Sequence, residues 1–333
     1  MPNLIILGLL FFSTVVVVTS TSWFTAWMGL EMNMMAFIPL TMNSSKTSSE
    51  VMIKYFLIQV MGSLILLLSG VLAQQDSPMT FTFFHNLWSM MLMLALTTKL
   101  GMFPIYFWFP ALAEGLSWFS LGLLVTWQKL APLTLLIMSP LKTYLMISFG
   151  LASAMLGAIG GLNQLMLRKL MAYSSIAHLG WITSLAPLSS QGVIFYIWTY
   201  ILLTATIITL FSSLNMIHLL QSNMLKTTAP LSLTLIFITT LSLGGMPPFT
   251  GFIPKWLTIQ ALSLENLHAL ALILAWSSVC TLFFYMRINY ALLMTSLHLQ
   301  LPPQTPLSIA PWKSPLIITS NIALPLMILL TPM

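Results

Sequence analysis

The stretch LTTKLGMFPIYFWFP at residues 96–110 decides how this chain folds. It is almost wholly apolar, carries glycine and proline near its centre, and places Lys99 beside that break. A second stretch, LSLGGMPPFTGFIPKW at residues 241–256, has the same features, with Lys255 after its break. Glycine and proline interrupt helices. Both stretches therefore predict membrane helices that are broken beside a charged residue.

The composition predicts an all-α membrane protein. Hydrophobic residues make up 58% of the 333 residues and charged residues only 5%, against about 25% charged in soluble proteins. The mean hydropathy is +0.97. The net charge of +6 comes from basic residues that are scattered singly, apart from Arg168-Lys169. We therefore expect no nucleic-acid partner and expect the lipid bilayer as solvent.

A window of about 19–20 residues predicts eleven membrane-spanning helices. They lie near residues 3–21, 23–43, 53–73, 84–110, 117–138, 144–164, 170–188, 193–214, 230–262, 268–292 and 314–331. The fourth and ninth are too long for one straight span, and these two hold the breaks. The first segment lacks the basic start of a signal peptide, so we expect it to be retained.

The loop charges predict the orientation. Six basic residues fall on the side of the N-terminus, and only Lys142 falls on the other. The six are Lys46, Lys54, Arg168, Lys169, Lys226 and Lys313. Because basic loops stay on the cytosol-like side, the N-terminus should face that side and the C-terminus the other. Arg287 is expected to snorkel from the tenth span to the positive side.

The two breaks indicate an internal repeat. Each is the fourth helix of a group of five, with residues 1–138 as the first group and 144–292 as the second. Five is odd, so the second group should be inverted in the membrane relative to the first. Interrupted helices at matching places in two halves point to a transporter-like site. Residues 293–333 are expected to form a Pro-rich loop and one C-terminal transmembrane helix.

Three lysines lie deep inside apolar runs: Lys99, Lys129 and Lys255. Each costs roughly 2.5–3.5 kcal/mol at a bilayer centre, so the three together cost about 8–10 kcal/mol. Such residues usually face a bundle interior or a water-filled cavity, and burial makes a lysine easier to deprotonate. We therefore predict that these lysines carry protons. The alternative is that prolines kink packed helices and the lysines are merely paired.

Two further residues are candidates for the proton path. Glu31 is the one acidic residue in the interior of a predicted span, and it would favour the charged form of Lys99. The alternative for Glu31 is a static buried ion pair. His178 is the one histidine well inside a span, and its ordinary pKa near 6.5 suits a relay. A hydrogen bond to a neighbouring helix explains His178 equally well.

Several chemistries lack their sequence signals. The chain has one cysteine, Cys280, and therefore no cysteine cluster for an iron–sulfur centre. It has no P-loop and no strand–GxGxxG–helix unit for a dinucleotide. We expect no cofactor and no metal on this chain, and no redox chemistry of its own. The energy for any pumping then comes from an ion gradient or from a partner.

Six motifs resemble one family, the chain-2 subunits of mitochondrial NADH–ubiquinone oxidoreductase, which is respiratory complex I. The motifs are WMGLEMNMMAFIPL at 27–40, KYFLIQ at 54–59, TKLGMFP at 98–104, LLVTWQKLAPL at 123–133, GGLNQLMLRKLMAYSSIAHLGW at 160–181 and LSLGGMPPFTGFIPKW at 241–256. The resemblance runs from about residue 20 to 290. The chain departs from the family pattern at Tyr106, where a histidine is usual, and at Glu114, because the family places its acid at position 111.

The resemblance implies an antiporter-like, multi-pass subunit of the mitochondrial inner membrane, with its N-terminus in the matrix and its C-terminus in the intermembrane space. It implies membrane-arm subunits of complex I as partners. NADH, FMN, iron–sulfur clusters and ubiquinone would belong to the whole complex. The family's proton-path residues fall here on Glu31, Lys99, Lys129 and Lys255, and its membrane histidine falls on His178.

The leading hypothesis is a core subunit of the proton-pumping NADH:ubiquinone reductase. Protons would pass along the lysines, Glu31, His178 and water, and redox chemistry in other subunits would drive them. One rival is a self-standing cation/proton antiporter of related fold. The other is a membrane scaffold in which the lysines only pair. The predicted arrangement of helices is compatible with all three hypotheses and does not distinguish them.

Overall fold

A computed structural model describes residues 2–41, 46–74, 82–139, 141, 143–219 and 230–296. These ranges form α-helices α1 to α13 and one short 3₁₀ helix, η1, and contain no β-strand. The predicted all-helical fold is therefore confirmed. The described chain falls into two compact units that divide between Ser153 and Ala154, within α8. The predicted loop and span beyond residue 296 lie outside the described residues.

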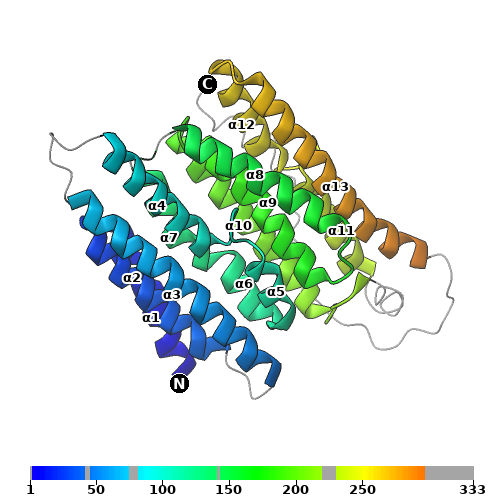
Figure 1. Ribbon diagram of the computed structural model, residues 1–333. Helices are drawn as coiled ribbons and strands as arrows, with labels where there is room; N and C mark the ends of the chain where they lie inside the picture. Colours follow the sequence, from blue (N-terminus) through cyan, green and yellow to red (C-terminus); the bar gives the residue numbers. More distant parts are fainter. Residues whose placement is uncertain are drawn as a thin grey trace. The chain divides into compact units, whose positions relative to one another are not determined.

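The first unit contains a group of long helices that lie side by side. Its elements are α1 (Pro2–Val18), α2 (Trp23–Thr41), α3 (Lys46–Gln74), α4 (Thr82–Leu100), α5 (Trp108–Gly115), α6 (Trp118–Val125), η1 (Trp127–Lys129), α7 (Leu130–Met138) and the first part of α8 (Thr143–Leu162). Neighbours in sequence pack together from α1 to α4, and α7 packs against α1, α2 and α4 (Figure 1). The short α5 packs against α3.

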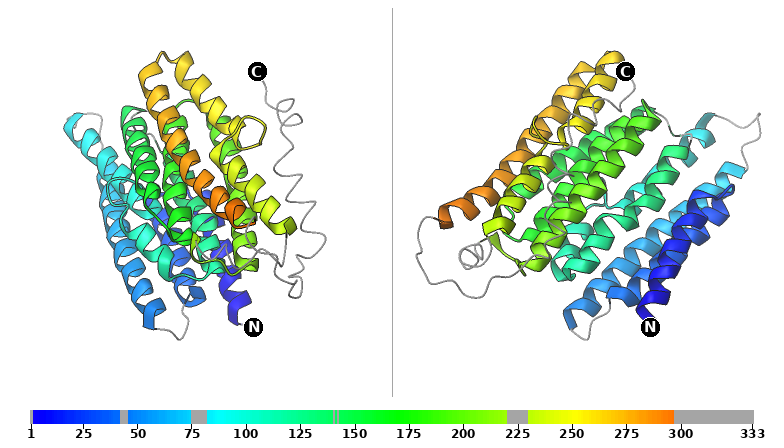
Figure 2. Two further views of the ribbon diagram at one scale, coloured as in Figure 1. Left: turned by 90° about the vertical axis from the view of Figure 1, so that its right-hand side faces the viewer. Right: turned by 180° about the vertical axis from the view of Figure 1, so that it is seen from behind.

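The second unit is built around α9. Its elements after α8 are α9 (Leu167–Leu185), α10 (Ser190–Ser213), α11 (Pro230–Gly244), α12 (Phe252–Leu264) and α13 (His268–Ser296). Helices α10, α12 and α13 all pack against α9, and α11 packs against α10 and α13 (Figure 2). Nearly every side chain of α9 is buried, so this helix forms the core of the unit.

Within the described residues, five helices are long and apolar enough to cross a membrane. They are Ser49–Ala73, Trp118–Met138, Thr143–Leu162, Ser190–Ser213 and His268–Leu292, where the second joins α6, η1 and α7. Three shorter apolar helices, Leu4–Val18, Leu87–Leu100 and Ser232–Gly244, have 10–17 residues. The first ten predicted segments each contain helix in the structure. The count of eleven spans stays a prediction.

The fifth predicted span is interrupted, which the sequence analysis missed. Residues 117–138 were expected as one continuous helix, but α6 ends at Val125, η1 occupies Trp127–Lys129 and α7 starts at Leu130. Pro132 explains the break. Its ring cannot donate a hydrogen bond and would clash with the carbonyl four residues earlier, at Gln128. The chain therefore starts a new helix at Leu130, where proline is tolerated in the first turn.

The two predicted breaks have the same local structure. Helix α4 ends at Leu100, and Gly101 then adopts φ +71°. Its N–H donates to the carbonyl of Thr98, and the N–H of Met102 donates to that of Thr97. This is a Schellman cap, which satisfies helix-end carbonyls and favours glycine at the left-handed position. The expected broken helix is confirmed here.

The second break repeats this cap 144 residues later. Helix α11 ends at Gly244, Gly245 has φ +79°, and Gly245 and Met246 donate to Ser242 and Leu241. The following helices, α5 and α12, start at Trp108 and Phe252, which are again 144 residues apart. Pro110 and Pro254 each stand at the third position of their helix. The division at 138 and 144 and the inversion of the two halves stay predictions.

Arg287 is bonded at the end of α8, and its expected snorkelling to the positive side stays a prediction. It lies in α13, is half-buried, and donates from Nη1 to the carbonyl of Leu162 at 2.6 Å and from Nη2 to the carbonyl of Gln164. Leu162 is the last residue of α8. A cation at a helix C-terminus satisfies free carbonyls and stabilises the helix dipole. Arg287 therefore joins α13 to the end of α8 within the second unit.

Gly101→Ala should destabilise the assembled protein. The left-handed conformation costs a residue with a Cβ about 1–2 kcal/mol, and the new Cβ would lie 2.9 Å from Cδ2 of Phe109. We expect a lower thermal unfolding midpoint and less assembled protein in detergent extracts. Gly8→Ala is the matched control, because a Cβ at Gly8 meets no atom within 4 Å. Equal midpoints for the two variants would contradict this account of the break.

Candidate functional site

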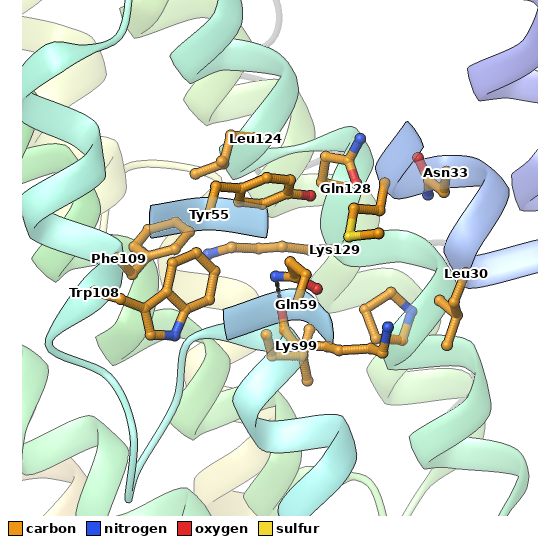
Figure 3. Close-up of a pocket in the computed structure, with 13 residues that line it drawn as sticks. Leu30, Asn33, Tyr55, Gln59, Lys99, Trp108, Phe109, Leu124, Gln128 and Lys129 are labelled. Carbon is orange, nitrogen blue, oxygen red and sulfur yellow. Dashed lines mark hydrogen bonds between the residues drawn. The ribbon is translucent and has the colours of Figure 1, made fainter. Parts of the chain in front are cut away.

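A buried cavity in the first unit collects two of the predicted lysines. Lys99 and Lys129 both line it, and only 8% and 3% of their surfaces are exposed. The cavity offers about 20 Å³ to the centre of a water molecule, and about 10–15 Å³ suffices for one water. Its walls come from α2, α3, α4, α5, α6, η1 and α7 (Figure 3).

Lys129 reaches the cavity from the interrupted span. It is the last residue of η1, and its ammonium lies 4.6 Å from the ring centre of Phe109 in α5. In Figure 3 the side chain extends toward Phe109 and Trp108, past Tyr55. A cation over an aromatic face is attracted by the ring quadrupole, more strongly when both are desolvated. The aromatic wall therefore stabilises the charged form of Lys129.

Lys99 enters the same cavity from the end of α4. Its side chain extends on the opposite side of Gln59 from the ammonium of Lys129 (Figure 3). The side-chain amide of Gln59 in α3 donates to the backbone carbonyl of Lys99 at 3.3 Å. That carbonyl belongs to the last turn of a helix, where carbonyls lack partners within the helix. Gln59 thus holds the end of α4 in place beside both lysines.

Glu31 interacts with Lys99 at longer range than a contact ion pair. Its carboxylate interacts electrostatically with both Lys99 and Tyr55. Among the described residues, however, no ion pair within 4 Å joins Glu31 to Lys99. Glu31 is half-buried and does not line the cavity; α2 presents Leu30, Asn33 and Met34 to it instead. Residues at i, i+3 and i+4 share one helix face, and Glu31 is one position off that face.

The second unit holds Lys255 beside the other break. Lys255 lies in the first turn of α12, is 5% exposed, and donates from Nζ to the carbonyl of Gly244 at 2.8 Å. Gly244 is the last residue of α11. The ammonium also lies 5.8 Å from the ring centre of Trp181 in α9. A lysine thus caps the carbonyl end of the helix that precedes its own, at the negative end of that helix dipole.

His178 lies in a group of tyrosines in the second unit. Its Nδ1 is 3.1 Å from the hydroxyl of Tyr196 in α10, and its ring centre is 5.2 Å from that of Tyr200. Ser175 interacts with the hydroxyl of Tyr200. His178 and Trp181 are three residues apart in α9 and so share a helix face. The hydrogen bond to a neighbouring helix exists, and a relay role for His178 stays a prediction.

The structure thus places Lys99 and Lys129 on the walls of one cavity, with Glu31 interacting electrostatically with Lys99. In the other unit His178 lies in α9, and Lys255 lies in α12 beside Trp181 of α9. Sequence reasoning missed the cavity residues Gln59, Asn33 and Gln128. All three lie inside the family motifs, and polar side chains in the interior of apolar spans were a usable signal. No group of three or more metal-ligating side chains occurs among the described residues.

Comparison with known proteins identifies the family. The family model described as NADH:quinone oxidoreductase/Mrp antiporter, TM matches residues 20–281. The chain belongs to this family. Proteins called NADH-ubiquinone oxidoreductase chain 2 from Suncus etruscus and Peropteryx macrotis are each 40% identical to it, over 97% of this chain and 96% of theirs. The resemblance inferred from the six motifs is confirmed.

Solved structures share the fold. A chain of respiratory complex I from Thermus thermophilus superposes with a TM-score of 0.83, at 20% identity, over 95% of this chain and 75% of that one. A chain of the Mrp complex from Dietzia gives a TM-score of 0.74, at 16% identity, over 86% of this chain and 59% of that one. At these identities the likeness concerns the fold alone.

Gln59→Leu should loosen the break after α4. The substitution leaves the Lys99 carbonyl without its side-chain donor, and an unpaired buried polar group costs about 1–3 kcal/mol. We expect faster amide hydrogen exchange in peptides that cover residues 100–107, measured by mass spectrometry on the assembled complex. Gln260→Leu is the control, because Gln260 is exposed on α12. Unchanged exchange in Gln59→Leu would show that this bond does not hold the break.

Proposed function

We propose that this chain is a membrane subunit of the proton-translocating NADH:ubiquinone oxidoreductase, in which buried lysines bind and release protons. The observation that carries the proposal is the cavity onto which Lys99 and Lys129 both open, beside a capped helix break. The family supports it, because the chain-2 relatives span almost the whole chain. Electron transfer takes place in other subunits, which hold NADH, FMN, iron–sulfur clusters and ubiquinone.

The proposed setting is the mitochondrial inner membrane. The chain crosses it eleven times, with its N-terminus in the matrix and its C-terminus in the intermembrane space. The excess of basic residues on the N-terminal side supports this orientation. Its partners are other membrane-arm subunits of the same complex, together with the surrounding lipid. Protons are the transported ion.

The geometry suits reversible protonation of the lysines. A buried lysine releases its proton more readily than a lysine in water, because burial disfavours the charged form. Phe109 stabilises the charged form of Lys129, and Glu31 stabilises that of Lys99 through space. Redox chemistry in other subunits moves a charge near this chain. That charge changes how readily the buried lysines are protonated. The lysines then release or take up a proton.

The two units carry related machinery in this proposal. The 144-residue offset between the two caps, and between the starts of α5 and α12, supports two repeats with a broken fourth helix each. The repeats are residues 1–138 and 144–292, and the second is inverted relative to the first. Lys255 is the proton carrier of the second repeat, with His178 as its relay partner. The 293–333 segment adds one C-terminal helix.

A self-standing cation/proton antiporter is the second candidate, because the family description also covers Mrp antiporters. Reconstitution separates the two candidates. We expect the purified single chain in liposomes to show no cation-driven proton flux, measured with an internal pH dye. The assembled complex in the same liposomes should acidify the lumen on addition of NADH. Flux by the single chain would favour the antiporter.

Lys99→Met, Lys129→Met and Lys255→Met should each impair coupled proton translocation in the assembled complex. A positioned proton-transfer group contributes about 10²–10⁴-fold to a rate, so we expect proton translocation to slow by at least about tenfold. The measurement is proton uptake and NADH oxidation in proteoliposomes. Lys54→Met is the control, because Lys54 is exposed on α3.

Arginine at the same positions distinguishes conduction from a scaffold. Arg keeps the positive charge but does not deprotonate in proteins. Conduction therefore predicts that Lys255→Arg is as impaired as Lys255→Met. A scaffold of paired charges predicts that Lys255→Arg restores translocation, and that result would overturn the proposal.

A further inference from the structure

A glycine lies against the aliphatic chain of each lysine that stands beside a break. A Cβ on Gly62 in α3 would lie 3.2 Å from Cγ of Lys99. A Cβ on Gly245 would lie 2.8 Å from Cδ of Lys255. Carbon atoms in good contact are about 3.5–4.0 Å apart, so a side chain at either glycine would displace the lysine or its surroundings.

The two glycines differ in what else requires them. Gly245 adopts φ +79° as part of its helix cap, and this conformation alone favours glycine. Gly62 is buried in the interior of α3, where glycine is less favourable than alanine. The helix itself therefore gains nothing from a glycine at position 62, and the reason for it must lie in what packs there.

Helix α3 contacts Lys99 at two points. Gln59 and Gly62 are three residues apart and so share one face of α3. Gln59 donates to the backbone carbonyl of Lys99 at 3.3 Å, and in Figure 3 the Lys99 side chain extends past Gln59. Gly62 lies against Cγ of that side chain. The same helix face thus holds the backbone of Lys99 and borders its aliphatic chain.

Close packing of α3 on α4 is the alternative reason for this glycine. The atom nearest to a Cβ on Gly62 is Oγ1 of Thr98, at 2.7 Å. This hydroxyl donates to the carbonyl of Ala95 at 2.8 Å and is 3% exposed as part of a buried threonine. The two contacts are separable, because Thr98→Ala removes the hydroxyl and leaves Lys99 in place.

We propose that Gly62 is a positioning residue for Lys99, because the bare backbone of α3 lets the Lys99 aliphatic chain lie against it and so fixes where the ammonium stands. This inference rests on the proposed function. A Cβ at position 62 displaces Cγ, and the ammonium at the far end of the side chain moves further than Cγ. A misplacement of about 1 Å in a reacting group lowers a rate by up to about 10²-fold.

The test uses the assembled complex with Gly62→Ala, alone and combined with Thr98→Ala. Proton translocation in proteoliposomes should slow by at least about threefold in both, as part of the loss that misplacement causes. The pH of half-maximal translocation should shift by at least about half a unit, because a displaced Lys99 interacts differently with the carboxylate of Glu31. A contact that serves helix packing alone would not move this midpoint.

Gly70→Ala is the matched control. Gly70 lies in the same helix, and its new Cβ would lie 3.0 Å from Cβ of Trp23 in α2, with no lysine among its nearest atoms. The substitution therefore crowds α3 to a similar degree at a place remote from the proposed chemistry. We expect a lower thermal unfolding midpoint, with unchanged translocation per assembled complex and an unchanged pH midpoint.

The outcomes separate this inference from the proposed function. If Thr98→Ala restores translocation to Gly62→Ala, the glycine serves helix packing and the inference is wrong. If Lys99→Met impairs translocation while Gly62→Ala translocates normally, the inference is wrong and the lysine mechanism stands. If Lys99→Met also translocates normally, the proposed function fails.

A density map of the unaltered complex decides if the Gly62 variants do not assemble. A Lys99 aliphatic chain that lies against the backbone of Gly62 supports the inference. A chain that is directed away from α3 overturns it.

Discussion

The structure depends on satisfying helix ends inside a membrane. Backbone carbonyls freed by a broken helix have no water to bond in lipid, so the protein must supply their partners. Both breaks meet this need first with a Schellman cap at a glycine, Gly101 or Gly245. At each break one further carbonyl is bonded by a side chain: Gln59 donates to the carbonyl of Lys99, and Lys255 donates to that of Gly244. Lys99 and Lys255 lie beside these breaks, where polar groups are already needed to bond the free carbonyls.

Hydropathy and the positions of glycine and proline predict most of the helices from the sequence. Apolar runs place the first ten helical segments, and glycine and proline locate the breaks after α4 and α11, because these signals act within a few residues. The break before α7 was missed, although Pro132 marks it one turn later. A single proline in a long apolar run does not by itself separate a kink from a new helix, since that depends on how Gln128 and Lys129 are packed.

The charged residues of the candidate site were predicted from the sequence, and its neutral polar residues were missed. Lys99 and Lys129 stand out because a buried charge is costly, and the cavity brings them together. Glu31 was expected to act on Lys99 through space, and the two do interact electrostatically. The residue that α2 presents to the cavity is Asn33. Which face of an all-apolar helix is buried depends on its neighbours. Contacts such as Gln59 with Lys99, or His178 with Tyr196, join residues from different helices and leave no local pattern.

The hydrogen bond from Lys255 to Gly244 makes the rigidity of the junction between α11 and α12 depend on the charge of Lys255. A hydrogen bond from an ammonium is about twice as strong as one from a neutral donor, and the α11 dipole strengthens it further. Loss of the proton therefore softens the junction between α11 and α12, and its return stiffens the junction. The charge on one nitrogen atom thus affects how firmly the start of α12 is bonded to the end of α11.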